Sequence, residues 1–397
     1  MVSEWKIVRL CEICDKIGSG ATPKGGKDAY GTEGISLIRS QNVLDFAFTD
    51  DGLACINDEQ AQKLSNVEVK SRDVLLNITG DSVARACMVE DEYLPARVNQ
   101  HVAIVRGNTD RVLGSFLLYF LQREKPHLLQ LASAGATRNA LTKGMIEQLE
   151  IALPPLEEQR RIVGLLDAIQ NKIRTNKKIN DNLQQQLLTL YSELLAAHDI
   201  QQIVELRTLC AFQEGYVNPS QTHPEYFDGS VKWLRAVDIN ESFIIETSRT
   251  LTTAGFESAK KSALLFQPNT IAISKSGTIG RLGIIADYMC GNRAVINIRP
   301  HNPSQLPLIY AFLKSKQKEF PDLAVGSVQK NLYISILEPM QVGLPEAVAV
   351  DEFCNAGCDI LMMIQKNCRE NIALANLRDA LLPHLMSGEI DVSDIDI

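Results

Sequence analysis

Apolar and polar residues alternate in short segments of the first half of the chain, and the same order returns in the second half. The segment Ile35–Arg39 alternates in this way, and so does the segment Val231–Arg235, which lies 196 positions later. Such alternation predicts a half-buried strand. Further strand-like segments follow in both halves, at 73–76 and 269–272 and at 99–106 and 292–299. Because the matches keep their order while their offset drifts from 196 to 191, the sequence predicts two copies of one module.

A different pattern begins after Pro154 and Pro155, where apolar residues recur in alternating steps of four and three. This spacing is the a/d seam of a coiled-coil helix. The expected first seam is Ile162, Leu166, Ile169, Ile173, Asn176, Asn180, Leu183 and Leu187. The expected second seam, 191 positions later, includes Ile360, Ile364, Asn367, Asn371 and Leu374. Gly357 and Arg378 also fall on the second seam and are expected to weaken it.

Two asparagines occupy equivalent places at the centre of each seam. A buried Asn at such a position costs stability but fixes the register of the helices. In an antiparallel pair, Asn176 would face Asn371 and Asn180 would face Asn367, although a parallel pair would also match Asn with Asn. We expect the antiparallel pair, because a two-fold axis through both centres would then exchange the helices and the two modules. The alternative is that the helices only hold two duplicated domains together.

These patterns predict a mixed α/β (α+β) protein with a pseudo-two-fold internal repeat. We expect globular domains at residues 1–153 and 199–344, long helices at 154–198 and 345–390, and a tail at 391–397. Within the domains, helices such as the one predicted at 111–123 would pack against short strands. A chain of 397 residues that is 45% apolar is long enough to form both cores.

Composition argues against several classes of protein. The longest apolar run, Leu113–Leu121, is too short to span a membrane. Glu4 and Arg9 stand where a signal peptide needs an apolar core, so we expect a cytosolic protein. Cys11 and Cys14 form a lone Cys-x-x-Cys, whereas a zinc site needs four ligands. We therefore expect the nine cysteines to be reduced and mostly buried, with no metal site.

The sequence also lacks the motifs of the enzymes that such a chain would suggest. Residues 20–28 approach a P-loop, but Ala21 replaces its first glycine and Asp28 its hydroxyl residue. Leu153 and Leu156 flank the Pro-Pro pair where an adenine methyltransferase would carry an acidic or Asn residue and an aromatic one. We therefore expect a protein that is not an enzyme and binds no cofactor. The rival interpretations are a catalytic restriction or modification enzyme and a coiled-coil scaffold that does not bind nucleic acid.

Polar and basic side chains on loops are candidates for DNA contact, because such side chains form hydrogen bonds with base edges and phosphates. In the first module the candidates are Ser19, Thr22, Arg39, Gln41, Asn42, Thr79, Ser82, Arg85, Arg138 and Asn139. In the second module they are Arg235, Lys275, Ser276, Thr278, Arg281, Arg293, Gln329, Lys330 and Asn331. For each of them, ordinary turn chemistry or a surface charge is an equally good explanation. The net charge of -8 argues against DNA binding by this chain alone, unless basic residues are local or partners supply phosphate contacts.

Three segments resemble the DNA-specificity subunits of type I restriction-modification systems: the opening Trp5–Leu10, the entry to the first long helix at 153–162, and the tail at 377–390. The resemblance covers the whole chain, but the second helix begins with Glu346 and Ala347 and lacks the Glu-Gln pair of the first. It implies two target-recognition domains that bind a split double-stranded DNA target. It also implies two modification (methyltransferase) subunits and restriction/translocase subunits as partners. S-adenosylmethionine, ATP and magnesium are then expected on those partners.

Overall fold

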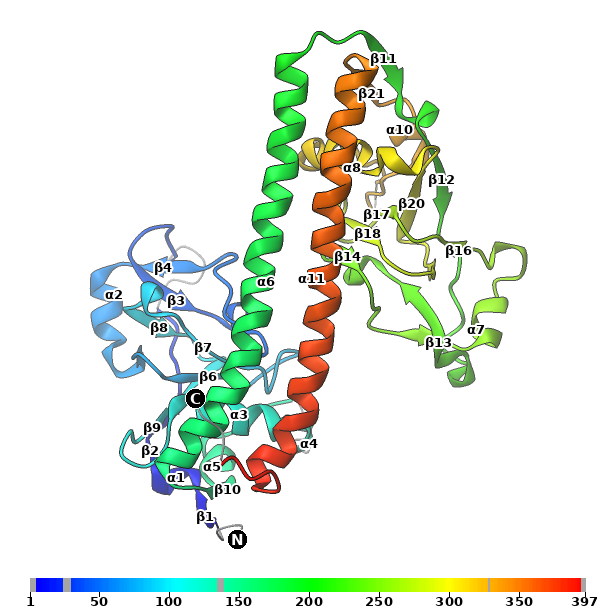
Figure 1. Ribbon diagram of the computed structural model, residues 1–397. Coiled ribbons are helices and arrows are strands. Elements are labelled where there is room, and N and C mark those ends of the chain that lie inside the picture. Colours follow the sequence, from blue (N-terminus) through cyan, green and yellow to red (C-terminus); the bar gives the residue numbers. More distant parts are fainter. Residues whose placement is uncertain (1–4, 24–29, 134–138, 328, 394–397) are drawn as a thin grey trace. The chain divides into compact units, whose positions relative to one another are not determined.

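The computed structural model describes residues 5–23, 30–133, 139–327 and 329–393 (Figure 1). The chain forms two compact units, one of Met1–Lys172 with Leu374–Ile397 and the other of Ile173–Ala373. The boundary crosses two long helices, α6 (Leu156–Ala197) and α11 (Ala347–Ser387). Each unit therefore contains one globular module and a segment of both long helices.

The first module contains two four-stranded sheets. The sheet nearer the long helices, here the coil-side sheet, has the order β2 (Cys14–Ser19), β9 (Val102–Gly107), β6 (Val74–Asn77) and β7 (Ala86–Met88). The outer sheet has the order β4 (Ala54–Ile56), β3 (Ile35–Ile38), β8 (Ala96–Val98) and β5 (Glu68–Val69). A separate antiparallel pair joins β1 (Lys6–Arg9) to β10 (Glu150–Leu153). The helices are α1 (Leu10–Ile13), α2 (Asp58–Lys63), α3 (Gly114–Arg123), α4 (Lys125–Ser133) and α5 (Lys143–Glu147).

The second module repeats this topology. Its coil-side sheet has the order β12 (Cys210–Glu214), β20 (Val295–Pro300), β17 (Thr270–Ser274), β18 (Leu282–Ile285) and the added strand β14 (Phe243–Ile244). Its outer sheet has the order β15 (Thr250–Leu251), β13 (Phe227–Leu234), β19 (Met289–Gly291) and β16 (Leu265–Phe266). The separate pair is β11 (Gln202–Glu205) with β21 (Gln341–Leu344). The helices are α7 (Thr253–Glu257), α8 (Leu306–Ser315), α9 (Phe320–Leu323) and α10 (Ile334–Leu337). The predicted internal repeat and mixed α/β fold are confirmed.

Each coil-side sheet is buried on both faces. In the first module, Leu76 of β6 packs in one core with Phe116 of α3 and Ile162 of α6. The adjacent Leu75 points to the opposite face and packs in a second core with Leu37 of the outer sheet. The prediction of a half-buried strand at 35–39 is wrong, because the inner strand β3 has both Leu37 and Ile38 fully buried.

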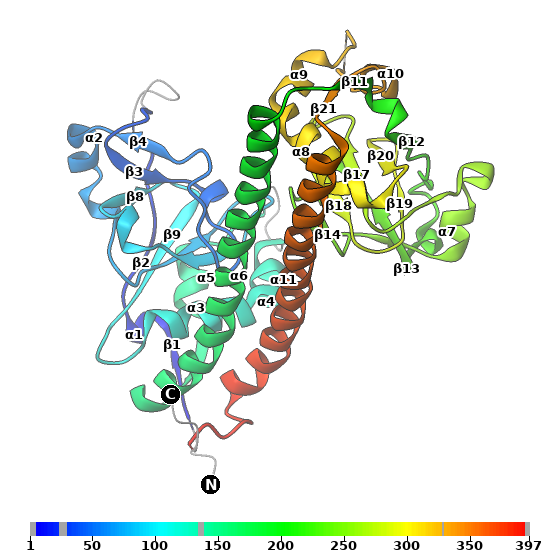
Figure 2. The ribbon, with the colours of Figure 1, turned by 45° about the horizontal axis from the view of Figure 1, so that its top comes forward.

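The long helices run antiparallel, as predicted (Figures 1 and 2). In the second unit, Asn176 Nδ2 donates to Asn371 Oδ1 at 3.0 Å. The next layer follows when Asn367 Nδ2 donates to Asn180 Oδ1 at 2.8 Å. In the first unit, the start of α6 and the end of α11 share a core that includes Ile162 and Leu385. The same antiparallel pairing therefore holds in each unit.

The two exceptional seam residues contact the modules. A Cβ atom on Gly357 would lie 2.5 Å from Cβ of Pro307, so a glycine is needed for α8 to approach α11. Arg378 is 9% exposed and donates from Nη1 to Gln170 Oε1 at 2.8 Å. Its guanidinium carbon also lies 3.8 Å from the ring centroid of Phe46. The expected weakening of the seam is therefore offset by contacts that only the tertiary structure provides.

The cysteines are free thiols, and the expectation that they are mostly buried holds for fewer than half of them. Four are buried, namely Cys87, Cys210, Cys290 and Cys354, whereas Cys11 is exposed. Within the described part of the chain, no cluster of His, Cys, Asp or Glu side chains is arranged to hold a metal ion. Of the helices that the structure describes, none is long and apolar enough to cross a membrane.

Candidate nucleic-acid interface

In the first module, loops that are distant in sequence meet at one end of the coil-side sheet. Ile78, just after β6, donates its backbone N–H to His101 O at 3.0 Å. The carbonyl of Ile78 accepts from Leu141 N at 2.8 Å. A further bond from Gly20 N to Val102 O, at 2.9 Å, brings in the loop after β2. These bonds gather the loops at 18–22, 79–85, 99–101 and 139–141.

The second module gathers the equivalent loops by equivalent bonds. Lys275 N donates to Ala294 O at 2.7 Å, and Lys275 O accepts from Leu332 N at 2.9 Å. Gly215 N donates to Val295 O at 2.9 Å. The same three backbone connections therefore exist in both modules, which places three groups of sequence-predicted candidates on one surface in each.

A tight turn at the centre of each surface presents one exposed side chain. Asn99 Oδ1 accepts from His101 N at 3.1 Å, and Asn292 Oδ1 accepts from Ala294 N at 3.0 Å. The residue between them is Gln100 in the first module and Arg293 in the second, and both are exposed. The sequence analysis missed Gln100, although its alignment with Arg293 in the internal repeat was sufficient to find it.

The glycine-containing loop after β2 has a structural requirement. A Cβ atom on Gly20 would lie 2.0 Å from the carbonyl oxygen of Val98, and one on Gly215 would lie 2.2 Å from that of Asn292. These glycines therefore allow the loop to approach the neighbouring chain. Ser19 and Thr22, on either side of Gly20, are exposed and remain predicted DNA contacts.

Arg39 and Arg235 begin equivalent 3-10 turns, η2 (Ser40–Asn42) and η7 (Ala236–Asp238). Their backbone N–H groups donate to Asn42 Oδ1 at 3.1 Å and to Asp238 Oδ2 at 2.9 Å. Each guanidinium carbon lies 5.6 Å from an aromatic ring, of Tyr30 in one module and Trp233 in the other. The structure therefore holds both arginines in the same way.

Asn42 is not free to contact a base, and the prediction that it does so is wrong. Its side chain is fully buried, and Nδ2 donates to Thr49 O at 3.0 Å and to Asp51 O at 3.2 Å. The amide is therefore engaged in holding its own loop. Gln41, its neighbour, is exposed.

Lys275 carries a charge that the protein itself compensates. Its Nζ donates to Glu214 Oε1 at 2.8 Å and lies 4.9 Å from the ring centroid of Tyr333. Burial raises the pKa of Glu214, but hydrogen bonds from Lys275 and Tyr216 outweigh it, so the pKa lies below its usual value. The predicted role of Lys275 as a free cation for phosphate is therefore corrected to that of a partner in an ion pair.

Exposure sorts the other candidates. Besides Ser19, Thr22 and Gln41, the exposed ones are Asn139, Thr278, Arg281, Arg293, Gln329 and Lys330. The half-buried ones include Thr79, Ser82, Arg85, Ser276 and Asn331. Thr79 Oγ1 and His101 Nδ1 are hydrogen-bonded at 2.7 Å, and Asn331 Nδ2 donates to Gln329 O at 3.0 Å. Arg138 lies outside the described residues, and its role stays a prediction.

The repeat, the antiparallel helices and the shared loop surfaces agree with one known family. The model of the type I restriction modification DNA specificity domain matches residues 2–185 and 201–350. The chain belongs to this family. Similar proteins include the HindI specificity subunit of Haemophilus influenzae, which is 21% identical over 469 residues that cover 98% of this chain and 100% of the relative. The putative MjaX specificity subunit of Methanocaldococcus jannaschii is 22% identical, over 98% of this chain and 94% of the relative.

A solved structure shows that the fold is also shared. The S subunit of a type I restriction-modification system from M. genitalium aligns with a TM-score of 0.53 and 12% identity, over 99% of this chain and 97% of that one. The resemblance inferred from the sequence is confirmed. The homologues are specificity subunits, which are non-catalytic DNA-recognition components, so the prediction that this chain is not an enzyme is confirmed as well.

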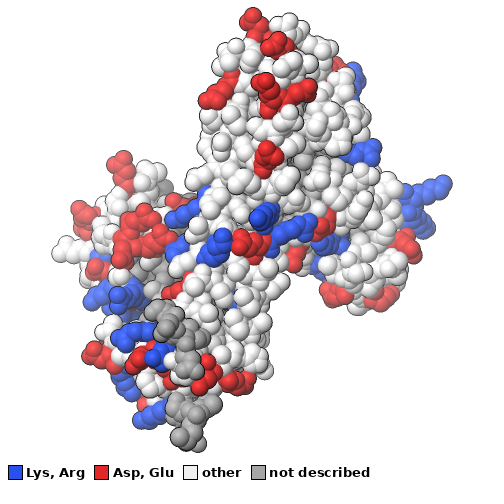
Figure 3. All heavy atoms as spheres, viewed as in Figure 1, with Lys and Arg blue, Asp and Glu red and all other residues white. Residues whose placement is uncertain are grey.

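The charge of the visible surface is mixed. Figure 3 shows Lys and Arg interspersed with Asp and Glu and no single basic field on that face. A protein that bound DNA by electrostatics alone would concentrate basic residues on one face. Recognition by this chain therefore depends on local side chains, with much of the phosphate neutralisation left to other groups.

Proposed function

We propose that this specificity subunit binds a bipartite DNA target, in which each module recognises one half and the sequence between the halves is not read. The main support is the recurrence of the same loop surface in both modules, built by the same backbone bonds. The surfaces differ in their side chains, as with Gln100 and Arg293 at equivalent turns. Two surfaces of one design but different chemistry suit two different half-sites.

We further propose that the chain holds two modification (methyltransferase) subunits and restriction subunits. The S-adenosylmethionine, ATP and magnesium that methylation and cleavage require would bind to those partners. Exposed apolar residues on the long helices support a role in assembly, because Ile179 of α6 is 38% exposed and Met362 and Met363 of α11 are 64% and 53% exposed.

Exchange of one module tests the two-part target. In a complex assembled with its modification subunits, residues 1–150 are replaced by the same module from another family member. Sequencing of methylated DNA is expected to show one half of the motif changed and the other half kept. A change in both halves would contradict recognition by two independent modules.

A further inference from the structure

In each unit, a loop of the outer lobe reaches from the candidate DNA-contact region to the long helices. The loops are residues 43–48 and 239–243, and each follows the turn that Arg39 or Arg235 begins. Phe46 has a φ of 59° and Glu241 has a φ of 66°. Residues other than glycine rarely adopt this left-handed conformation, so surrounding contacts must hold it in place.

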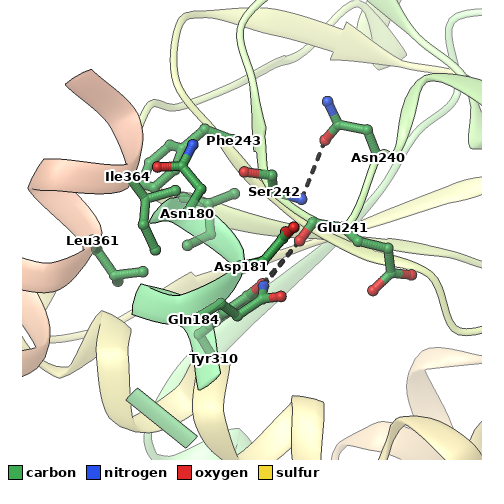
Figure 4. A pocket seen from close by; sticks show the side chains of 11 residues that line it. Asn180, Asp181, Gln184, Asn240, Glu241, Ser242, Phe243, Tyr310, Leu361 and Ile364 are labelled. Carbon is green, nitrogen blue, oxygen red and sulfur yellow. Dashed lines mark hydrogen bonds between the residues drawn. The ribbon is translucent and has the colours of Figure 1, made fainter. Parts of the chain in front are cut away.

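In the second unit, hydrogen bonds hold the loop (Figure 4). Gln184 of α6 donates from Nε2 to the backbone carbonyl of Glu241 at 3.0 Å and to the hydroxyl of Tyr310 at 2.6 Å. The carboxylate of Glu241 accepts from Gln317 at 2.8 Å and also from Lys314. A small cavity of about 90 Å³ lies beside these residues. The tip of the loop is therefore bound to both α6 and the α8 region.

A second connection in this unit is ionic. Arg369 of α11 donates to Asp287 Oδ1 at 2.6 Å, and Lys232 of the outer strand β13 donates to Asp287 Oδ2 at 2.7 Å. The hydrogen bond from Arg369, together with Lys232, keeps the pKa of Asp287 below its usual value. The carboxylate thus joins the outer lobe to α11.

The first unit makes the equivalent connection with different chemistry. The ring of Phe46 lies 3.8 Å from the guanidinium carbon of Arg378 in α11 and 6.0 Å from the ring of Tyr119. Tyr119 donates from its hydroxyl to Asp167 Oδ1 of α6 at 2.6 Å. Tyr119 and Tyr310 are 191 positions apart, as the repeat requires. The position of the contact is therefore shared by both units, although its chemistry is not.

We propose that these two loops, here called the latches, fix the angle of each outer lobe on the long helices and so limit which spacer lengths the protein accepts. This inference rests on the proposed two-part target. One extra base pair moves a half-site by about 3.4 Å and rotates it by roughly 35° about the DNA axis. A lobe that is held firmly to the helices cannot follow that rotation, whereas a lobe released from them can.

Two variants release the second latch by different routes. Glu241→Gly removes the carboxylate, and glycine adopts the left-handed conformation without strain. Arg369→Ala removes the ionic connection from a side chain that is 47% exposed, so the core of the module stays intact. Glu246→Ala is the matched control. It removes one exposed carboxylate from the same stretch of chain, and Glu246 makes no hydrogen bond or ion pair within the described residues.

The assembled complex is given DNA with both wild-type half-sites and spacers one base pair shorter, equal and one longer. In both latch variants, methylation at the altered spacers relative to the original is expected to rise about tenfold, as a change of about 1.4 kcal/mol would give. The control is expected to match the wild type. If both variants assemble and keep the wild-type spacer profile, the latch proposal is wrong while the two-part target stands. A continuous wild-type motif would instead overturn the proposed function, and the latch with it.

Discussion

At the scale of single residues, burial separates side chains that hold the loops from side chains that can contact DNA. Asn42 and Lys275 looked like DNA contacts in sequence, but the structure uses the first to hold its loop and the second to pair with Glu214. Arg85 and Arg281 lie on equivalent loops, and neither side chain forms a hydrogen bond or ion pair within the described residues. These two arginines are therefore the strongest remaining candidates for DNA contact in their loops.

Replacement of Arg85 or Arg281 by Ala, tested in the full complex, is expected to weaken DNA binding. If the arginine binds phosphate, affinity falls for all sequences and the salt slope decreases by about one. If it contacts a base, about 1–3 kcal/mol is lost at one motif position. Lys70→Ala is the control, because Lys70 precedes β6 whereas the candidate loop follows it. Salt titrations of binding that are unchanged in both variants would rule out these contacts.

The ion pair of Lys275 and Glu214 predicts a pH dependence of stability. The folded pKa of Glu214 lies below its unfolded value of 4.5, so the pair contributes stability above about that pH and loses it as the pH falls through the folded pKa. Glu214→Gln is expected to lower the free energy of unfolding at pH 7 by about 1–3 kcal/mol. At pH 3 the difference from the wild type is expected to shrink. Thermal unfolding at both values measures it, and an equal deficit at the two would contradict the assignment.

At the scale of elements, the polar layers in the long helices make the register specific. Slipping the helices by one heptad would separate Asn176 from Asn371 and place each amide opposite an apolar residue. The amide oxygen of Asn176 already lacks a hydrogen-bond partner, which shows that the layer is not optimised for stability. We infer that these asparagines are retained for register.

Single and double replacements of this layer separate register from stability. Asn371→Leu alone leaves Asn176 without one of its amide partners and is expected to cost about 1–3 kcal/mol. Adding Asn176→Leu restores an apolar layer and is expected to recover most of that loss. Thermal unfolding of the chain in its complex provides the measurement. A double variant less stable than the single one would show that the layer contributes stability in its own right.

At the scale of the whole molecule, each unit combines one module with part of both long helices, so the helices belong to both units. The modules share strand order in both of their sheets, which follows from the internal repeat. Since α6 and α11 are continuous through 42 and 41 residues, a change in their length alters the structure that connects the modules.

Removing one heptad from each long helix, at opposing positions, keeps the seams in phase. Each helix becomes about 10 Å shorter, which corresponds to roughly 3 base pairs of DNA. The methylated motif of an active complex is expected to keep both half-sites and to lose about 3 base pairs of spacer. This outcome differs from that of the latch variants, which broaden the accepted spacers. An active complex with its original spacer would show that the helices only hold the modules together.

The sequence by itself determined the features that depend on periodicity. The seams fix which residues face the partner helix, and the placement of the asparagines gives the pairs of 176 with 371 and 180 with 367 once the helices are antiparallel. The internal repeat likewise predicted the strands and aligned the loops, because equivalent positions in a duplicated fold occupy equivalent places.

Only the tertiary structure decided the roles of single side chains. Lys275 and Glu214 are 61 positions apart, and no local pattern indicates that they form an ion pair. Arg378 and Phe46 meet because the end of α11 packs beside a loop from the first module. Burial of Asn42 and of both faces of β3 depends on a second sheet that covers them. Periodicity specifies a face of one element, whereas burial and pairing depend on which distant element packs against that face.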